Sequence, residues 1–87
     1  MEGRRLILND GTVIENGEAG YSNGVLWCYF DGYTIQQAGS LFFNASVTAK
    51  ITFEYGEMTD EYEGFNNCVG IKIDSDGKIS VCLKRGG

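Results

Sequence analysis

Residues 25–55 predict a strand, a short helix and a second strand in immediate succession, and this unit constrains the fold more than any other stretch. Thr34 and Gln37 fit a capping box, in which the threonine hydroxyl accepts from the Gln37 N–H and the Gln37 side chain accepts from the Thr34 N–H. Asn44 is expected to end the helix in a left-handed conformation, which asparagine tolerates. A helix near residues 34–43 is too short to be stable alone in water, so it must pack on a sheet.

One face of the predicted helix carries apolar residues spaced three and four apart, and this face would meet the sheet. The strand before the helix, residues 25–30, is apolar on both faces, which is typical of a central strand or one covered on both sides. The strand after it, residues 49–55, alternates apolar and polar residues, which predicts one buried and one solvated face. The apolar helical positions are Ile35, Ala38, Leu41 and Phe42.

Turn sequences divide the rest of the chain into β-hairpins. Asn9-Asp-Gly11 supplies a glycine for the positive φ of a short turn, and Gly56-Glu57 fits a two-residue turn with glycine first. Asp74-Ser-Asp-Gly77 separates two segments in which apolar residues alternate with polar ones. The hairpins are expected at residues 4–15, 49–63 and 69–84.

The segment 16–24 has three glycines in nine residues and is predicted to be a loop. It is either a plain connection or a mobile contact loop. The predicted order of elements is therefore βββαββββ. This order describes a single α+β domain over residues 1–87, in which a mostly antiparallel sheet of β-hairpins carries a single helix.

The main core is expected to combine large apolar residues from the helix, the strands on either side of it and the last hairpin. Which face of the 25–30 strand meets the helix is open, so Trp27 lies either in that core or in a second cluster. The predicted core residues are Phe30, Ile35, Phe42, Ile51, Phe53, Ile71 and Val81.

The composition argues against most catalytic and cofactor chemistry. The 87 residues contain no histidine, which removes the commonest general base and every Ser-His or Cys-His nucleophile pair. Cys28, Cys68 and Cys82 are widely spaced, lack a Cys-x-x-Cys pair and are expected to be reduced thiols rather than metal ligands. We therefore predict a non-enzymatic protein with no catalytic, metal-binding or cofactor-binding residues and no cofactor.

One weaker pattern is interpreted as structural. Asp74-Ser-Asp76-Gly77 resembles the start of a calcium loop but lacks its later ligands, with Arg85 where that loop needs glutamate. No apolar run approaches the ~20 residues of a membrane span, and the first residues include no apolar signal region. The chain is expected to be cytoplasmic in a host cell, or part of a virion, without membrane contact.

The segment 54–63 carries five carboxylates and no basic residue, in a chain of formal net charge −5. These side chains either form a row that imitates a nucleic-acid backbone and fills a basic groove of a partner, or make a solvated edge that resists aggregation. Strand alternation would place the residues at 57, 61 and 63 on one face. The candidate protein-binding residues are Glu54, Glu57, Asp60, Glu61 and Glu63.

Four segments carry a family resemblance: Leu8-Asn-Asp-Gly-Thr12, Leu26-Trp-Cys-Tyr-Phe-Asp-Gly-Tyr33, Ile51-Thr-Phe-Glu-Tyr-Gly-Glu57 and Tyr62-Glu-Gly-Phe65. Together they resemble small uncharacterised prophage-encoded proteins of gut Firmicutes, and the likeness covers nearly the whole chain. The resemblance lies in turn and core residues. It implies a fold and an origin near phage tail and lysis genes, and it assigns no functional residues.

Two functions follow as expectations. The first is a non-enzymatic phage or prophage accessory or virion-associated protein that binds other proteins, such as a phage structural component, with sheet edges available for a homo-oligomer. The alternative is a small acidic inhibitor of a bacterial defence system, anti-CRISPR-like, that blocks the nucleic-acid-binding groove of a host defence protein. Direct binding to nucleic acid is disfavoured, because the seven Lys and Arg residues are dispersed and the net charge repels phosphate.

Overall fold

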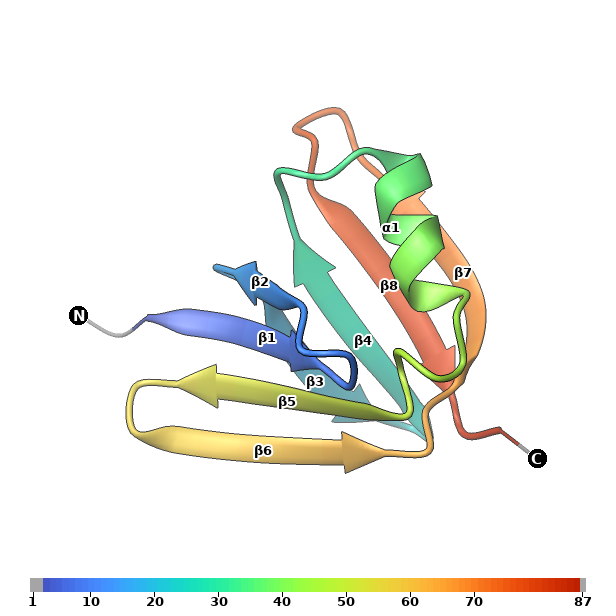
Figure 1. Cartoon of the computed structure of the whole chain (residues 1–87). Coiled ribbons are helices and arrows are strands. Elements are labelled where there is room, and N and C mark those ends of the chain that lie inside the picture. Colours follow the sequence, from blue (N-terminus) through green and yellow to red (C-terminus); the bar gives the residue numbers. More distant parts are fainter. Residues whose placement is uncertain (1–2, 87) are drawn as a thin grey trace.

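The structure, a computed structural model, describes residues 3–86. Over these residues it contains eight strands and one helix, in the order ββββαββββ (Figure 1). Their bounds are β1 Arg4–Leu8, β2 Val13–Glu15, β3 Glu18–Ser22, β4 Val25–Phe30, α1 Ile35–Phe42, β5 Lys50–Tyr55, β6 Met58–Glu63, β7 Asn67–Ile73 and β8 Ile79–Lys84.

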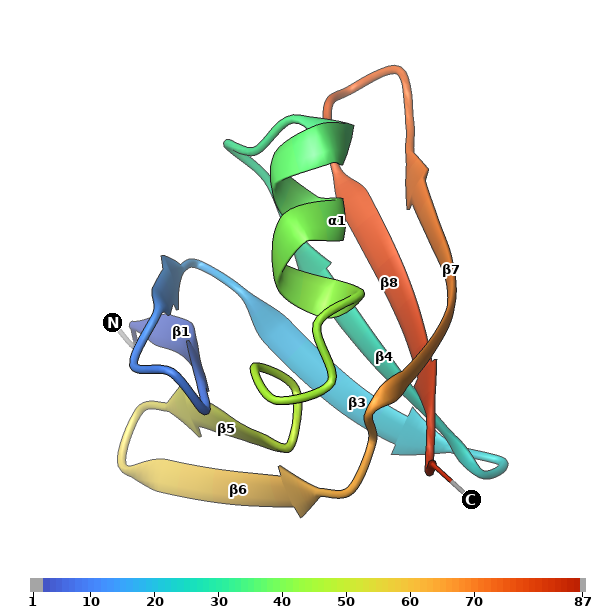
Figure 2. The ribbon, with the colours of Figure 1, turned by 45° about the vertical axis from the view of Figure 1, so that its right-hand side comes forward.

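The strands form two antiparallel sheets, with the order β2-β1-β5-β6 in sheet A and β3-β4-β8-β7 in sheet B. The inner faces of the two sheets meet across a shared core, and β3 contacts both β1 and β5. Helix α1 packs against β7 and β8, over the part of sheet B that sheet A leaves free (Figure 2). The predicted α+β class with one helix and antiparallel hairpins is confirmed, although the strands divide into two sheets.

All three predicted hairpin turns are present. Gly11, Gly56 and Gly77 have φ angles of 91°, 58° and 82°, in the region that glycine enters without a steric penalty. Tyr55 pairs with Met58, so Gly56-Glu57 is a two-residue turn with glycine in its first position. Local turn chemistry therefore fixes where the chain reverses.

The prediction that residues 16–24 form a loop is wrong, because Glu18–Ser22 is a strand that pairs with β4. Ser22 pairs with Val25, and the two residues between them, Asn23 and Gly24, both have positive φ at 54° and 78°. An Asn-Gly pair with two positive φ angles is the turn that suits a tight hairpin best. The strand was missed because β3 contains a glycine and lacks an alternation of large apolar residues. The interpretation of this segment as a mobile contact loop is therefore wrong as well.

Helix α1 begins as predicted but ends differently. Thr34 Oγ1 accepts from the Gln37 N–H at 3.0 Å and Gln37 Oε1 accepts from the Thr34 N–H at 2.8 Å, which completes the capping box. The expected left-handed Asn44 is not found, since its φ is not positive. Instead the Asn44 side chain accepts from the Ser46 N–H at 3.1 Å, and its carbonyl accepts from the Val47 N–H at 3.0 Å. The chain continues into a further turn, so no reversal is needed at Asn44.

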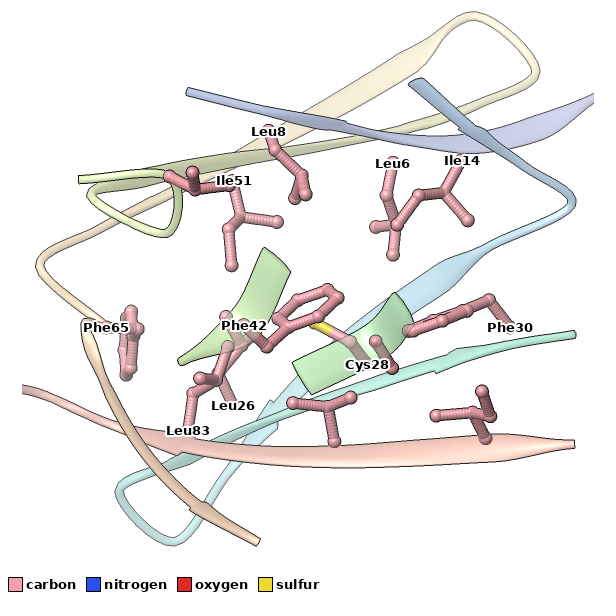
Figure 3. Close-up of a cluster of buried hydrophobic side chains, with 14 of the residues drawn as sticks. Leu6, Leu8, Ile14, Leu26, Cys28, Phe30, Phe42, Ile51, Phe65 and Leu83 are labelled. Atoms are coloured by element: carbon pink, nitrogen blue, oxygen red, sulfur yellow. The ribbon is translucent and has the colours of Figure 1, made fainter. Parts of the chain in front are cut away.

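The core lies between the sheets and under the helix (Figure 3). Five predicted core residues are buried, and Ile71 is half-buried and packs against the core from the edge of sheet B. The prediction that Ile35 belongs to the core is wrong, since 39% of its surface is exposed. A side chain at the first helical position points back beyond the start of the helix, and Ile35 therefore does not reach the sheet. The five buried residues are Phe30, Phe42, Ile51, Phe53 and Val81.

Strand β4 contributes one face to this core. Leu26, Cys28 and Phe30 are fully buried, and the Phe30 ring stacks on the Phe42 ring of α1 with centroids 5.4 Å apart. Val25, Trp27 and Tyr29 alternate with them and are only partly buried. The strand is central in its sheet, as predicted, but Trp27 belongs to the outer face and not to the core.

Candidate binding surfaces

The acidic segment forms the β5–β6 hairpin at one edge of sheet A (Figure 1). Its pairing register places Glu54, Glu61 and Glu63 on the outer face, opposite to the face that buries Ile51 and Phe53. Glu61 and Glu63 share a face, as strand alternation predicts, whereas Glu57 lies in the turn and Asp60 pairs with Phe53 on the inner side. The five carboxylates therefore do not form one continuous row.

Three of these carboxylates have partners within the chain. Glu54 Oε1 lies 2.7 Å from Arg5 Nε on β1, and this hydrogen bond raises the pKa of Arg5 above its usual value. Glu61 Oε2 lies 3.6 Å from Lys50 Nζ. The Tyr55 hydroxyl donates to Asp60 Oδ2 at 3.0 Å, which raises the pKa of Tyr55. Within residues 3–86, the carboxylates of this segment without an ion-pair partner are Glu57, Asp60 and Glu63, of which Glu57 and Glu63 are exposed.

The outer face of sheet B has the opposite character. Its centre is the pair Trp27 and Tyr29, whose rings are nearly parallel at 9° with centroids 6.2 Å apart. Trp27 pairs with Gly20 on β3 and with Cys82 on β8, and Cys82 pairs in turn with Gly70 on β7. The row through Trp27 therefore has only small neighbours on either side.

Helix α1 and the strands of sheet A pack on the inner side of sheet B. Arg4 of β1 reaches only the edge of the outer face, where it bonds Glu18 at 3.2 Å. Polar residues surround the pair: Glu18, Ser80 and Lys72 lie in the row of Tyr29, and Ser22 and Lys84 lie near the start of β4 beyond Trp27. The face thus combines partly exposed aromatic rings with a polar rim, which is the usual arrangement of a protein-binding surface. The sequence predicted a strand that is either central or covered on both sides, and this pattern did not show that one face of β4 lacks a covering element among residues 3–86.

The two sheets end in four edge strands, which are β2 and β6 in sheet A and β3 and β7 in sheet B. Strand β7 is the longest of them at seven residues, and its register with β8 shifts between Cys68 and Gly70. Val69 and Ile73 on this strand are 50% and 46% exposed. An exposed edge presents unpaired N–H and C=O groups to another strand.

The three cysteines are free thiols in different surroundings. Burial raises the pKa of Cys28 to about 12 and, more weakly, raises the pKa of the half-buried Cys68. Both shifts oppose the thiolate form that a nucleophile or a metal ligand needs. Cys82 lies on the outer face of sheet B beside Trp27.

Residues 3–86 contain no group of three or more metal-ligating side chains, and their single helix is not long and apolar enough to cross a membrane. A shallow cleft of about 270 Å³ lies at the start of β1, between Arg4, Arg5, Glu15 and Glu54. Both guanidinium groups already bond carboxylates, Arg4 to Glu18 at 3.2 Å and Arg5 to Glu54 at 2.7 Å. The charge of this cleft is therefore largely balanced within the chain.

Comparison with known proteins finds no match to a protein-family model, to a curated protein or to a solved structure. The surfaces of the chain are therefore the features from which its function can be inferred. Of these, the aromatic outer face of sheet B and the acidic β5–β6 hairpin differ most in chemistry.

Proposed function

We propose that the protein is a non-enzymatic phage or prophage accessory or virion-associated protein that acts through protein–protein contacts. The proposal combines the resemblance of the sequence to prophage-encoded proteins with the outer face of sheet B. Such a protein would work in the cytoplasm of the host cell or within the virion, and its partner would be a phage structural component.

The observation that carries the proposal is the uncovered aromatic face around Trp27 and Tyr29. Aromatic side chains that are partly exposed on a rigid sheet lose little conformational freedom when a partner covers them. Tryptophan and tyrosine are accordingly the residues that most often dominate the binding energy of an interface. The small neighbours of Trp27, Gly20 and Cys82, leave its ring accessible to a partner side chain.

Purified phage particles from a host that expresses a tagged form of the protein provide the test. We expect the wild-type chain in the particles, bound to a structural component, and we expect Trp27→Ala to weaken that binding about thirtyfold, as for the loss of an interface residue worth about 2 kcal/mol. Phe43→Ala is the matched control, since Phe43 is 66% exposed beyond the end of α1 and lies outside sheet B. Absence from particles, or equal loss of binding in both variants, would reject the proposal.

The second candidate is the anti-CRISPR-like inhibitor that presents the acidic segment to a basic groove. The observation that favours it is the exposure of Glu57 and Glu63 on the β5–β6 hairpin, at the edge of sheet A. The ion pairs of Glu54 with Arg5 and of Glu61 with Lys50 reduce the charge available for such a role. Capture of a host defence nuclease, with affinity that falls steeply as salt is added, would support this candidate over the first.

A further inference from the structure

The four edge strands differ in their ability to pair with a second copy of the chain. Strand β2 carries Glu15, β3 carries Glu18, and β6 carries Asp60, Glu61 and Glu63. Among the edges of the described sheets, β7 is the one without a carboxylate. Because the chain has a net charge of −5, pairing two copies through any other edge would bring like charges together.

Strand β7 also has exposed apolar side chains that a second copy would cover. Val69 and Ile73 are 50% and 46% exposed, and Ile71 lies between them at the edge of the core. Ile71 pairs with the buried Val81, so it faces inward, whereas Lys72 pairs with Ser80 on the outer face. The aliphatic residues of β7 are therefore Ile71 and Ile73 on the inward side and Val69, which is the extra residue at the register shift between Cys68 and Gly70.

We propose that two copies of the chain pair antiparallel along β7, about a two-fold axis at Ile71, and join their B sheets into one continuous sheet. The inference extends the proposed function, in that the first protein partner is a second copy of the chain. In this register Ile71 lies opposite its own copy, and Ile73 of one copy lies opposite Val69 of the other. Each exposed apolar residue of β7 then gains an apolar neighbour across the axis.

The same register keeps Lys72, the one charged residue of β7, away from Lys72 of the other copy. Lys72 of one copy lies opposite Gly70 of the other, so the two lysines do not face each other. Beyond Gly70, the same row of that copy continues through Cys82 to Trp27. Small residues thus leave an open path along which the Lys72 ammonium group can approach the negative face of the indole ring.

The size of the contact predicts its strength. A seven-residue strand is about 24 Å long. Pairing one such edge covers less than the roughly 800 Å² per partner of a typical stable interface. The register shift at Cys68 and the charge of Lys72 also disfavour nonspecific pairing of β7 with strands of other molecules. We therefore expect a specific but weak dimer that dissociates in the micromolar range.

Analytical ultracentrifugation under reducing conditions, from about 5 µM to about 1 mM protein, measures this equilibrium. The mass should rise from 9.5 kDa toward twice that value as the concentration increases. The emission of Trp27, which is the single tryptophan of the chain, should shift over the same range, and Lys72→Met should reduce this shift. A chain that stays monomeric at the highest concentration would overturn the inference.

Charged substitutions on β7 test whether this strand forms the dimer interface. Val69→Lys combined with Ile73→Lys should weaken the dimer at least about tenfold, because like charges then meet across the axis. Val13→Lys is the matched control, since Val13 is 41% exposed on the edge strand β2 of sheet A. If the lysine pair prevents folding, Val69→Thr with Ile73→Thr replaces it. A dimer that resists the β7 substitutions, or is lost equally in the control, would contradict pairing along β7.

The two proposals can fail separately. A strictly monomeric wild-type chain that still enters phage particles would reject the dimer and leave the proposed function in place. A chain that dimerises along β7 but is absent from particles would reject the proposed function alone.

Discussion

Sheets A and B have the same number of strands and the same antiparallel pairing, yet their outer faces differ sharply. Sheet A presents cross-strand ion pairs, such as Arg5 with Glu54 and Lys50 with Glu61. Sheet B presents the parallel rings of Trp27 and Tyr29 with small residues beside them. Two carboxylates of sheet A, Glu54 and Glu61, are paired with basic groups of the same sheet, whereas the Trp27 and Tyr29 rings of sheet B remain partly exposed.

The inner faces show no such difference, because both sheets contribute fully buried side chains to one core. Leu6, Leu8 and Ile51 of sheet A point toward Leu26, Cys28 and Leu83 of sheet B in the same core cluster (Figure 3). Folding therefore depends on both sheets, and the chemical difference between them lies on their outer surfaces. The predictions below separate these two roles.

The largest expected effect is on the shared core. Phe30→Ala in sheet B and Phe53→Ala in sheet A should each cost ~3–5 kcal/mol of unfolding free energy, a large share of the ~5–15 kcal/mol available to a domain. Phe30 is fully buried against Phe42, while Phe53 is 8% exposed and stacks on Tyr55 with centroids 4.5 Å apart, so Phe30→Ala should be the more severe. Denaturant midpoints measure both, and a normal midpoint for either variant would exclude that residue from the core.

Alkaline pH should destabilise the protein through Cys28. Burial raises the pKa of this thiol from its ordinary value of 9.0 to about 12, so the unfolded chain loses the proton at lower pH than the folded chain does. The resulting stability is complete below pH 9 and is lost as pH rises toward 12, by about 4 kcal/mol in total.

Urea unfolding at a series of pH values measures this loss. Cys28→Ala is the control, because it removes the thiol and should flatten the pH dependence even though its overall stability is lower. Tyr62, whose pKa is raised by burial, and Tyr55 should leave a residual slope at alkaline pH in both proteins. An unchanged slope in Cys28→Ala would show that the thiol does not titrate within the core.

The parts of this fold that were predictable are those specified by neighbouring residues. The capping box at Thr34 and the turns at Gly11, Gly56 and Gly77 depend on local chemistry, and all of them are present. The division into two sheets depends instead on long-range pairing, such as β1 with β5 and β4 with β8. The alternation of apolar residues is the same in both sheets, so it indicates strands without indicating their neighbours.

In the candidate surfaces, too, features set by neighbouring residues could be predicted and features set by long-range pairing could not. Alternation correctly placed Glu61 and Glu63 on one face of β6. The partner of Glu54 could not be predicted, because Arg5 is brought beside it only by the pairing of β1 with β5. The sequence also could not predict that one face of β4 lacks a covering element in the described part of the chain, because an apolar pattern indicates that a face is apolar and does not indicate which element packs on it.

The smallest expected effect is that of reversing charge on sheet A. Changing Glu57, Glu61 and Glu63 together to lysine should leave the fold intact, because all three are exposed and surface substitutions usually change stability by less than about 0.5 kcal/mol each. The loss of the Lys50–Glu61 pair adds little, since exposed ion pairs contribute little to stability. Circular dichroism and a denaturant midpoint close to the wild type would verify that the variant is folded.

Partner binding by this folded variant then compares the two outer faces directly. If contacts are made through sheet B, assembly with the phage component should persist in the triple variant, depend weakly on salt and be lost in Trp27→Ala. If the acidic hairpin fills a basic groove, the triple variant should lose its partner while Trp27→Ala retains it, and wild-type binding should fall steeply with salt. We expect the first result, because three of the five carboxylates already have partners within the chain whereas the Trp27 ring does not share its row with any large side chain of sheet B. If the triple-lysine variant is folded but no longer binds, the partner-binding surface lies on the acidic hairpin of sheet A and not on sheet B.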